Sequence, residues 1–262
     1  MRKASVKALV ITMAAVLCAL LMTASVALAA SGSKAPDMQK ILDNIDKLST
    51  FPNNDFSAVM TIVSEDPKKG VEKHVVRMFR RDRENKFLLL FQEPEVMKGQ
   101  GYLLVDDNLW FYDPESRKFT HTSMKENFSG TDAKNSDFSQ STLAKDYQVK
   151  SWSEAKFYNY DVYILELEAR NDEVTYPTLK LWVNKEPNLV LKTESYSLSG
   201  RLLRSALIPN YAKVGSAYVA TSMILIDELV AGKKTQITLK NISIQNLPDS
   251  VFTKSYMERV NR

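Results

Sequence analysis

Apolar and polar positions alternate over short segments along most of this chain, and this period of two is typical of β-strands. The segments are separated by turns rich in Asn, Asp, Gly, Pro and Ser, which favours an antiparallel sandwich or barrel over βαβ units. The predicted strands are 56–63, 71–81, 86–92, 101–105, 109–112, 118–121, 147–152, 161–169, 178–183, 190–196, 202–208, 217–226 and 235–244.

One segment near the N-terminus has the helical period instead. Apolar side chains recur on one face over residues 37–48, and Asp37 follows a proline in the place of an N-cap. The apolar positions are Met38, Ile41, Leu42, Ile45 and Leu48. We expect this helix to pack on the sheet.

Several predicted strands are apolar on both faces. Residues 87–91 are five apolar residues in a row, and 217–226 is apolar on both sides. An antiparallel sheet with one solvated face would alternate, so both faces must be covered here. The N-terminal helix is one expected cover, and an enclosed cavity or the loop that follows 118–121 is the other. The apolar phase also reverses within 235–244, which predicts a bulge near Asn241.

Residues 123–145 are polar, with isolated apolar side chains at Met124, Phe128, Phe138 and Leu143. Ser136 or Asp137 would cap a short helix through Ala144. The segment is either an ordinary surface loop or a lid over an apolar mouth; the two phenylalanines favour the lid. As lid residues, they should matter more for ligand retention than for folding. Trp110, on a strand next to this loop, should lie near the same mouth.

The first 30 residues differ in kind from the rest. Arg2, Lys3 and Lys7 precede an uncharged run that ends in Ala27-Leu28-Ala29, as in a cleaved secretory signal peptide. An uncleaved membrane anchor and lipidation of Cys18 are the alternatives. We therefore divide the chain into a leader, 1–30, and one domain, 31–262.

Composition excludes several classes of function. Without the three basic residues of the leader, 32 of the 35 Lys and Arg remain against 31 Asp and Glu, so there is no basic footprint for nucleic acid. The single cysteine lies in the leader, which leaves the domain without disulfides or a thiol nucleophile. His74 and His121 are interpreted as surface strand histidines, and Asp106-Asp107 as a hairpin tip. No nucleotide, zinc or hydrolase motif is present in the sequence. We expect no enzyme, no metal and no cofactor.

Two stretches resemble a bacterial family. The first is Phe91, Pro94, Lys98-Gly99, Leu104 and Trp110-Phe111-Tyr112-Asp113-Pro114, with Asn135-Ser136-Asp137-Phe138 further on; the second is Tyr176-Pro177-Thr178-Leu179-Lys180-Leu181-Trp182-Val183, with Leu247-Pro248-Asp249 near the end. In order and spacing they are similar to the outer-membrane lipoprotein-sorting-like proteins, the relatives of LolA, LolB and the N-terminal domain of RseB.

The resemblance implies a mostly β fold, in which a strongly curved antiparallel sheet forms a half-open β-barrel. An N-terminal helix and a short helical lid would cover its apolar concave face. The implied function is that of a periplasmic carrier or receptor for lipid or lipoprotein acyl chains, with an inner-membrane transporter or an outer-membrane acceptor as partner. The alternative is a non-enzymatic interaction or sensor module, similar to RseB or to an accessory of a membrane export pump.

On this reading the acyl chains would contact apolar side chains of the strands and the lid. The expected lipid-binding residues are Met60, Phe79, Leu89, Phe91, Leu103, Trp110, Phe128, Phe138, Leu143, Leu181 and Ile224.

Overall fold

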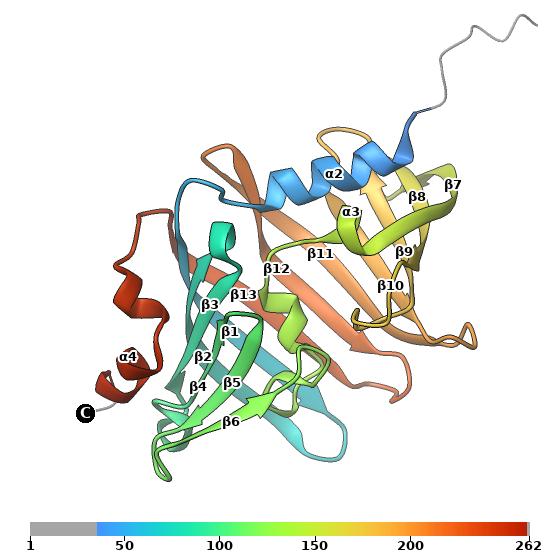
Figure 1. The fold of residues 1–262 in the computed structure, drawn as a ribbon. Coiled ribbons are helices and arrows are strands. Elements are labelled where there is room, and N and C mark those ends of the chain that lie inside the picture. The colour runs from blue at the N-terminus through green and yellow to red at the C-terminus, as the bar shows by residue number, and fades with distance from the viewer. Residues whose placement is uncertain (1–35, 261–262) are drawn as a thin grey trace, which may run out of the picture. The chain divides into compact units, whose positions relative to one another are not determined.

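The computed structural model describes residues 36–260, and within them thirteen strands form one antiparallel sheet (Figure 1). The strands are β1 (Phe56–Asp66), β2 (Gly70–Arg81), β3 (Lys86–Glu93), β4 (Gly101–Val105), β5 (Asn108–Asp113), β6 (Lys118–Thr122), β7 (Tyr147–Phe157), β8 (Tyr160–Ala169), β9 (Thr178–Asn184), β10 (Val190–Tyr196), β11 (Leu202–Val214), β12 (Ala217–Asp227) and β13 (Lys234–Ser243). Every predicted strand is present, which confirms the mostly β class; β7 and β11 extend furthest beyond their predicted ends.

The strand order is β6-β5-β4-β3-β2-β1-β13-β12-β11-β10-β9-β8-β7. The chain thus forms two meanders, β1–β6 and β7–β13, which join side by side through β1 and β13. The described part of the sheet is curved and stays open between β6 and β7, as the half-open barrel requires (Figure 1). At the β4–β5 turn, Asp106 and Asp107 have φ of 50° and 59°, which suits a tight two-residue hairpin and confirms the predicted tip.

The predicted bulge is also present. Ser57 of β1 pairs with Ser243, but Val59 pairs with Lys240, so β13 carries one extra residue between these pairs. Asn241 lies there with φ of 52°, in the left-handed region that Asn tolerates better than most residues. The extra residue turns the apolar side chains of β13 from one face to the other.

Helix α2 (Met38–Ser49) lies across one face of the sheet, which we call the inner face (Figure 1). Asp37 caps it by accepting hydrogen bonds from the backbone N–H groups of Gln39 and Lys40. The apolar side of α2 packs against strands of the second meander, as predicted. This inner cluster contains Met38, Ile41, Leu42, Ile45, Leu165, Leu167, Leu179, Leu181, Val183 and Val190.

The segment 123–146, called here the covering loop, lies over the inner face of the first meander. It contains two short 3-10 turns, Phe128–Gly130 and Asn135–Phe138, and the short helix α3 (Leu143–Asp146). The predicted single helix through Ala144 is therefore wrong, because residues 139–142 separate the second turn from α3. Phe128 stacks on Phe91 with 5.3 Å between ring centroids, and Phe138 meets Phe128 edge-on at 4.7 Å.

The outer face of β3–β5 is covered by the C-terminal segment, a cover that the sequence analysis did not anticipate. This segment contains a 3-10 turn, Asp249–Phe252, and helix α4 (Lys254–Arg259). Val251, Phe252 and Met257 pack there on Leu88, Leu103 and Tyr112. The five apolar residues of β3 are thus shared between two covers, because alternate side chains point to opposite faces.

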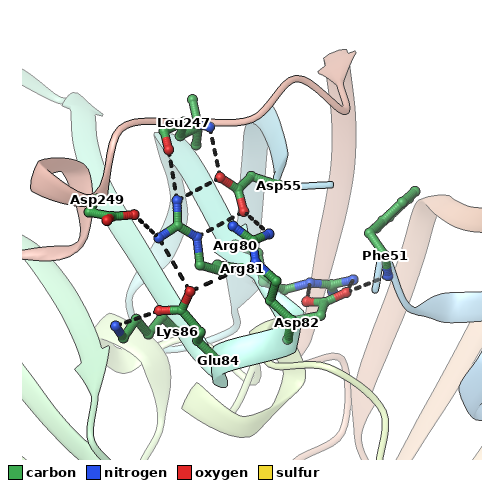
Figure 2. Close-up of polar contacts among 10 residues, drawn as sticks. Phe51, Asp55, Arg80, Arg81, Asp82, Glu84, Lys86, Leu247 and Asp249 are labelled. Atoms are coloured by element: carbon green, nitrogen blue, oxygen red, sulfur yellow. Dashed lines mark hydrogen bonds and ion pairs between the residues drawn. The ribbon is translucent and has the colours of Figure 1, made fainter. Parts of the chain in front are cut away.

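A buried network of ion pairs ties this segment to the sheet (Figure 2). Arg81 lies between Asp55 on one side and Asp249 on the other, and donates a further hydrogen bond to the backbone oxygen of Leu247. Asp55 also accepts from Arg83 and from the backbone N–H of Leu247. One buried guanidinium therefore joins the start of β1, the end of β2 and the C-terminal segment.

In the described part of the chain, no helix combines the length and the apolar character needed to cross a bilayer. The predicted leader, 1–30, lies outside the described residues. Residues 37–260 contain the whole sheet and all three apolar clusters.

Candidate functional site

A cavity of about 570 Å³ lies on the inner face, where the cluster under α2 meets the cluster under the covering loop. Cross-strand pairing brings its floor together: Thr193 of β10 pairs with Ala206 of β11, which pairs with Leu225 of β12. These residues share one face because directly paired side chains in a sheet point the same way. The apolar floor consists of Leu179, Ala206, Ile208, Met223 and Leu225.

The facing walls of the cavity are mostly polar. The covering loop contributes hydroxyl and amide side chains, and the β8–β9 loop contributes residues 171 and 173–176. The polar wall residues of the covering loop include Ser136, Asp137, Ser139, Gln140, Ser141 and Thr142. The cavity thus combines an apolar floor with many polar wall groups, an arrangement that suits an amphipathic ligand whose apolar part lies on the floor.

One ion pair lies in the cavity wall on the side of the covering loop. Both terminal nitrogens of Arg204 on β11 contact the carboxylate of Asp137, at 2.6 and 2.8 Å. Arg204 also lies over the ring of Tyr176 at 5.2 Å and donates to the backbone oxygen of Asp132. Burial alone would lower the pKa of Arg204, but the charge and hydrogen bonds of Asp137 raise it. The guanidinium is therefore charged, and this two-point contact fixes the loop in one orientation.

A second contact holds the same loop at Asp132. Its carboxylate lies 2.7 Å from the ammonium of Lys233 and accepts a hydrogen bond from the hydroxyl of Thr235 at 2.9 Å. All three side chains are largely buried. The covering loop is thus attached to β11 and to the start of β13 by separate charged side chains.

Helix α2 holds the end of the loop. Asp46 accepts hydrogen bonds from the hydroxyl of Ser141 and from the backbone N–H groups of Leu143 and Ala144, at the start of α3. Burial raises the pKa of Asp46, although these donors oppose the shift. The carboxylate fits an N-terminal helix end, where unpaired N–H groups favour negative charge.

His74 is buried on the inner face, and its interpretation as a surface residue is wrong. Its ring meets Phe91 edge-on at 5.6 Å between centroids, and neither ring nitrogen has a hydrogen-bond partner in the described chain. Phe91 in turn stacks on Phe128 of the covering loop. Burial lowers the pKa of His74, and the nearby Glu72 opposes this shift only in part.

This histidine predicts a pH dependence of stability. Because its pKa in the folded state lies below the ordinary value, its contribution is complete above about pH 6.5 and is lost as the pH falls further. We expect His74→Leu to flatten the loss of unfolding free energy between about pH 7.5 and pH 5, measured by urea unfolding at both values. An unchanged pH dependence in this variant would show that other groups cause it.

Of the residues expected from the sequence to bind lipid, Leu143 lines the cavity directly. Met60, Leu89, Phe91, Phe128 and Phe138 are buried in the cluster under the covering loop, and Leu181 lies under α2. Phe79 and Leu103 belong to the outer-face cluster beneath the C-terminal segment. Ile224 pairs with Leu207, on the face opposite to Ala206 and Leu225.

Trp110 does not lie near the cavity. It pairs with Leu103 on the outer face, and the ammonium of Lys254 from α4 lies 3.3 Å from the centre of its ring. The prediction of its location is wrong because β5 is apolar on both faces, so the sequence gives no sign of which face turns inward.

Most residues that form the cavity and hold the covering loop were not predicted from the sequence. Arg204, Asp46 and Lys233 are separated from their loop partners by 67 or more residues in the chain, and no local pattern links them. Ala206 looks like any small strand residue. The one usable signal is the arginine in strand 202–208, whose other residues are apolar except for Ser205, because a charge at such a place requires a partner.

Comparison with known proteins places the chain in a family. A family model described as that of an uncharacterized protein matches residues 83–259. No curated protein matches the chain.

Solved structures with the same fold include three bacterial proteins. A LolA superfamily protein from Nitrosomonas europaea is 26% identical, with a TM-score of 0.72 over 83% of this chain and 98% of that one. A domain described as that of an outer-membrane lipoprotein-sorting protein, from Vibrio parahaemolyticus, is 21% identical, with a TM-score of 0.75 over 84% and 98%. A DUF1329 family protein from Desulfovibrio piger is 21% identical, with a TM-score of 0.74 over 84% and 97%. The chain therefore belongs to the family of the matching model, and it shares the fold of the LolA superfamily protein and of the other two structures.

Proposed function

We propose that this protein is a non-enzymatic periplasmic carrier or receptor that binds a lipid or lipoprotein acyl chain in the cavity on the inner face of its sheet. The observation that carries the proposal is the cavity itself: about 570 Å³ with an apolar floor beneath a loop held by ion pairs. Its volume lies within the range of roughly 300–1,000 Å³ that is usual for small-molecule sites.

The energetics suit a carrier that must also release its cargo. Each buried methylene contributes about 0.8 kcal/mol, so one long acyl chain supplies on the order of 10 kcal/mol before any costs. A cargo larger than the present cavity would need the covering loop to move, and that movement would break the contact between Asp137 and Arg204. The energy of that contact offsets part of the binding energy, because a separated and largely buried ion pair is costly.

The sorting-like relatives support the periplasm as location, and the leader pattern of residues 1–30 agrees with export. An acyl carrier of this kind would receive its cargo from an inner-membrane transporter or deliver it to an outer-membrane acceptor.

Filling the cavity tests the proposal. In the chain from Ser31 to Arg262, Ala206→Trp places an indole over the floor, and we expect binding of a fluorescent fatty acid to weaken at least about tenfold. The matched control is Ser153→Trp, at an exposed position of β7 that does not line the cavity. Native mass spectrometry of the exported protein should also detect lipid bound to the parent chain and less to Ala206→Trp.

Two results would overturn the proposal. One is the absence of any acyl ligand from the parent chain in both measurements. The other is an equal loss of binding in Ala206→Trp and Ser153→Trp, because that would place the ligand elsewhere or show a general effect of added tryptophan. A stable protein partner bound to a chain with an empty cavity would instead favour an interaction or sensor module.

A further inference from the structure

Exposed aliphatic side chains gather at one end of the sheet. The turns that follow β1, β3, β10 and β12 all lie at this end, because the strands are antiparallel and β1 ends where β13 begins. They are consecutive along the edge of the sheet, since each joins neighbouring strands in the order β4-β3, β2-β1, β13-β12 and β11-β10. We call these four turns the aliphatic rim; in Figure 1 the β1–β2 and β12–β13 turns lie in the lower part of the view.

Each turn of the rim presents at least one large aliphatic side chain to solvent. Leu198 is 92% exposed, Val96 86% and Val71 70%, and Leu229 and Val230 are also exposed. The described chain has nine exposed large hydrophobic residues, and these five make up more than half of them. The five lie singly or in a pair on neighbouring turns at one end of the sheet, which makes that end a candidate binding surface.

The turns hold these side chains in place. The carboxylate of Asp227 accepts hydrogen bonds from the backbone N–H groups of Leu229 and Val230, which orders the β12–β13 turn. Neighbouring turns also touch, because a Cβ on Gly232 would lie 3.3 Å from Cγ of Pro67. The rim is therefore a row of ordered tips, spaced roughly 10 Å apart as alternate strands are.

Charge differs between the two ends of the sheet. The four turns of the rim carry four exposed basic residues, Lys68, Lys69, Lys98 and Arg201, against two exposed acidic ones, Glu95 and Glu228. At the opposite end, the β2–β3 and β4–β5 turns carry the exposed acidic residues Glu84, Asp106 and Asp107 against one exposed basic residue, Arg83. An anionic surface would attract the rim and repel the other end.

We propose that the aliphatic rim docks on the surface of a lipid bilayer that contains anionic headgroups. Isolated aliphatic side chains on separate tips suit the fluid acyl region of a bilayer, with lysines at the level of the headgroups. A protein partner would instead favour a contiguous and closely packed apolar patch. This inference does not depend on what the cavity binds.

Docking would orient the cavity relative to the membrane surface. The β8–β9 loop is the next turn along the same end of the sheet, and its residues Val174 and Tyr176 line the cavity. A chain held by its rim therefore has one cavity wall close to the membrane surface.

Vesicle sedimentation tests the docking. The probe is the chain from Ser31 to Arg262, mixed with vesicles of phosphatidylethanolamine and phosphatidylglycerol or with vesicles of phosphatidylcholine alone. We expect the triple variant Val96→Ser, Leu198→Ser, Leu229→Ser to lower partitioning at least about tenfold, because each buried aliphatic side chain favours the bilayer. Lys68→Glu with Lys69→Glu should weaken binding to the anionic vesicles only, and less so at high salt. Tyr158→Asn is the matched control, since Tyr158 is 81% exposed at the opposite end.

A fluorophore gives a second measurement. The tested chain has no cysteine of its own, so Leu198→Cys and Tyr158→Cys can each be labelled with an environment-sensitive dye. Only the dye at residue 198 should shift to the blue on anionic vesicles. The proposal is overturned if the parent chain stays in the supernatant, if the triple variant and Tyr158→Asn lose binding equally, or if both dyes shift alike. Ala206→Trp should still dock, so failure of the cavity proposal and failure of this one are distinguishable.

Discussion

Replacing Phe128 by alanine is expected to lower the free energy of unfolding by about 3–5 kcal/mol, the usual cost of a large cavity in a core. Phe128 has no exposed surface, although it belongs to a loop. Its ring contacts Phe91, Tyr102 and Phe138, with centroid distances of 5.3, 4.9 and 4.7 Å. The view of Phe128 and Phe138 as lid residues of little importance for folding is therefore wrong. Urea unfolding followed by circular dichroism measures the effect.

Two comparisons make this result interpretable. Leu89→Ala, on the strand beneath, should cost about 2–5 kcal/mol, a similar amount. Leu143→Ala, at a half-buried position on the cavity wall, should weaken acyl binding more than it lowers stability. If Phe128→Ala destabilises far less than Leu89→Ala, the covering loop opens readily on its own and its aromatic residues are not part of the core.

The second large effect is expected at the ion pairs of Figure 2. Asp55 is fully buried and accepts from Nε and Nη2 of Arg81, both at 2.9 Å. Asp55→Ala leaves the buried Arg81 with two partly or fully exposed carboxylate partners in the described chain, Asp249 and, at 3.6 Å, Glu84, which should cost about 3–5 kcal/mol. In this variant the N–H of Leu247 loses its acceptor. The backbone amide hydrogens of the C-terminal segment should therefore exchange with solvent faster than in the parent chain.

A double variant separates the two causes of this loss. Asp55→Ala with Arg81→Met removes the unpaired charge and should recover part of the stability. Lys73→Ala is the control, since Lys73 and Glu93 form a pair that is more than half exposed and should contribute less than about 1 kcal/mol. If the double variant is as unstable as Asp55→Ala, the cost arises from packing and not from the buried charge.

The same network contributes to stability in a pH-dependent way. Burial would raise the pKa of Asp55, but the hydrogen bonds from Arg81 and from the N–H of Leu247 outweigh it and lower the pKa. The contribution of Asp55 is therefore complete above about pH 4 and is lost as the pH falls through the lowered pKa.

The strands could be predicted because their signals are local. The signals are the alternation of apolar and polar residues, the turn residues between strands, and the reversal of apolar phase near Asn241. Each extends over fewer than about a dozen residues, which is about the length of one strand. The need for two covers also followed from β3, where five consecutive apolar residues leave no side for water. The identity of the outer cover did not follow, since the C-terminal segment is far from β3 along the chain.

The site could not be predicted because its contacts are distant in the sequence. Asp137 looks like a helix cap, and only the folded sheet, with the covering loop over it, brings Arg204 of β11 into contact with it. The burial of Trp110 and Phe128 could not be predicted from the sequence either. Strands that are apolar on both faces do not reveal which face turns inward, and a polar loop does not reveal that its aromatic residues fill the core.

The pairing of β1 with β13 also determines the order in which this protein can assemble. Within each meander, most strands pair with their neighbours along the chain, and such local contacts form early at little entropic cost. The central pair instead joins Ser57 to Ser243, so it has to wait until nearly the whole chain is available. Until then both strands have an open edge, which in other sheets is a template for aggregation. A chain threaded through a membrane from its N-terminus would thus depend on a chaperone, or on rapid arrival of its last strand, to reach the folded state.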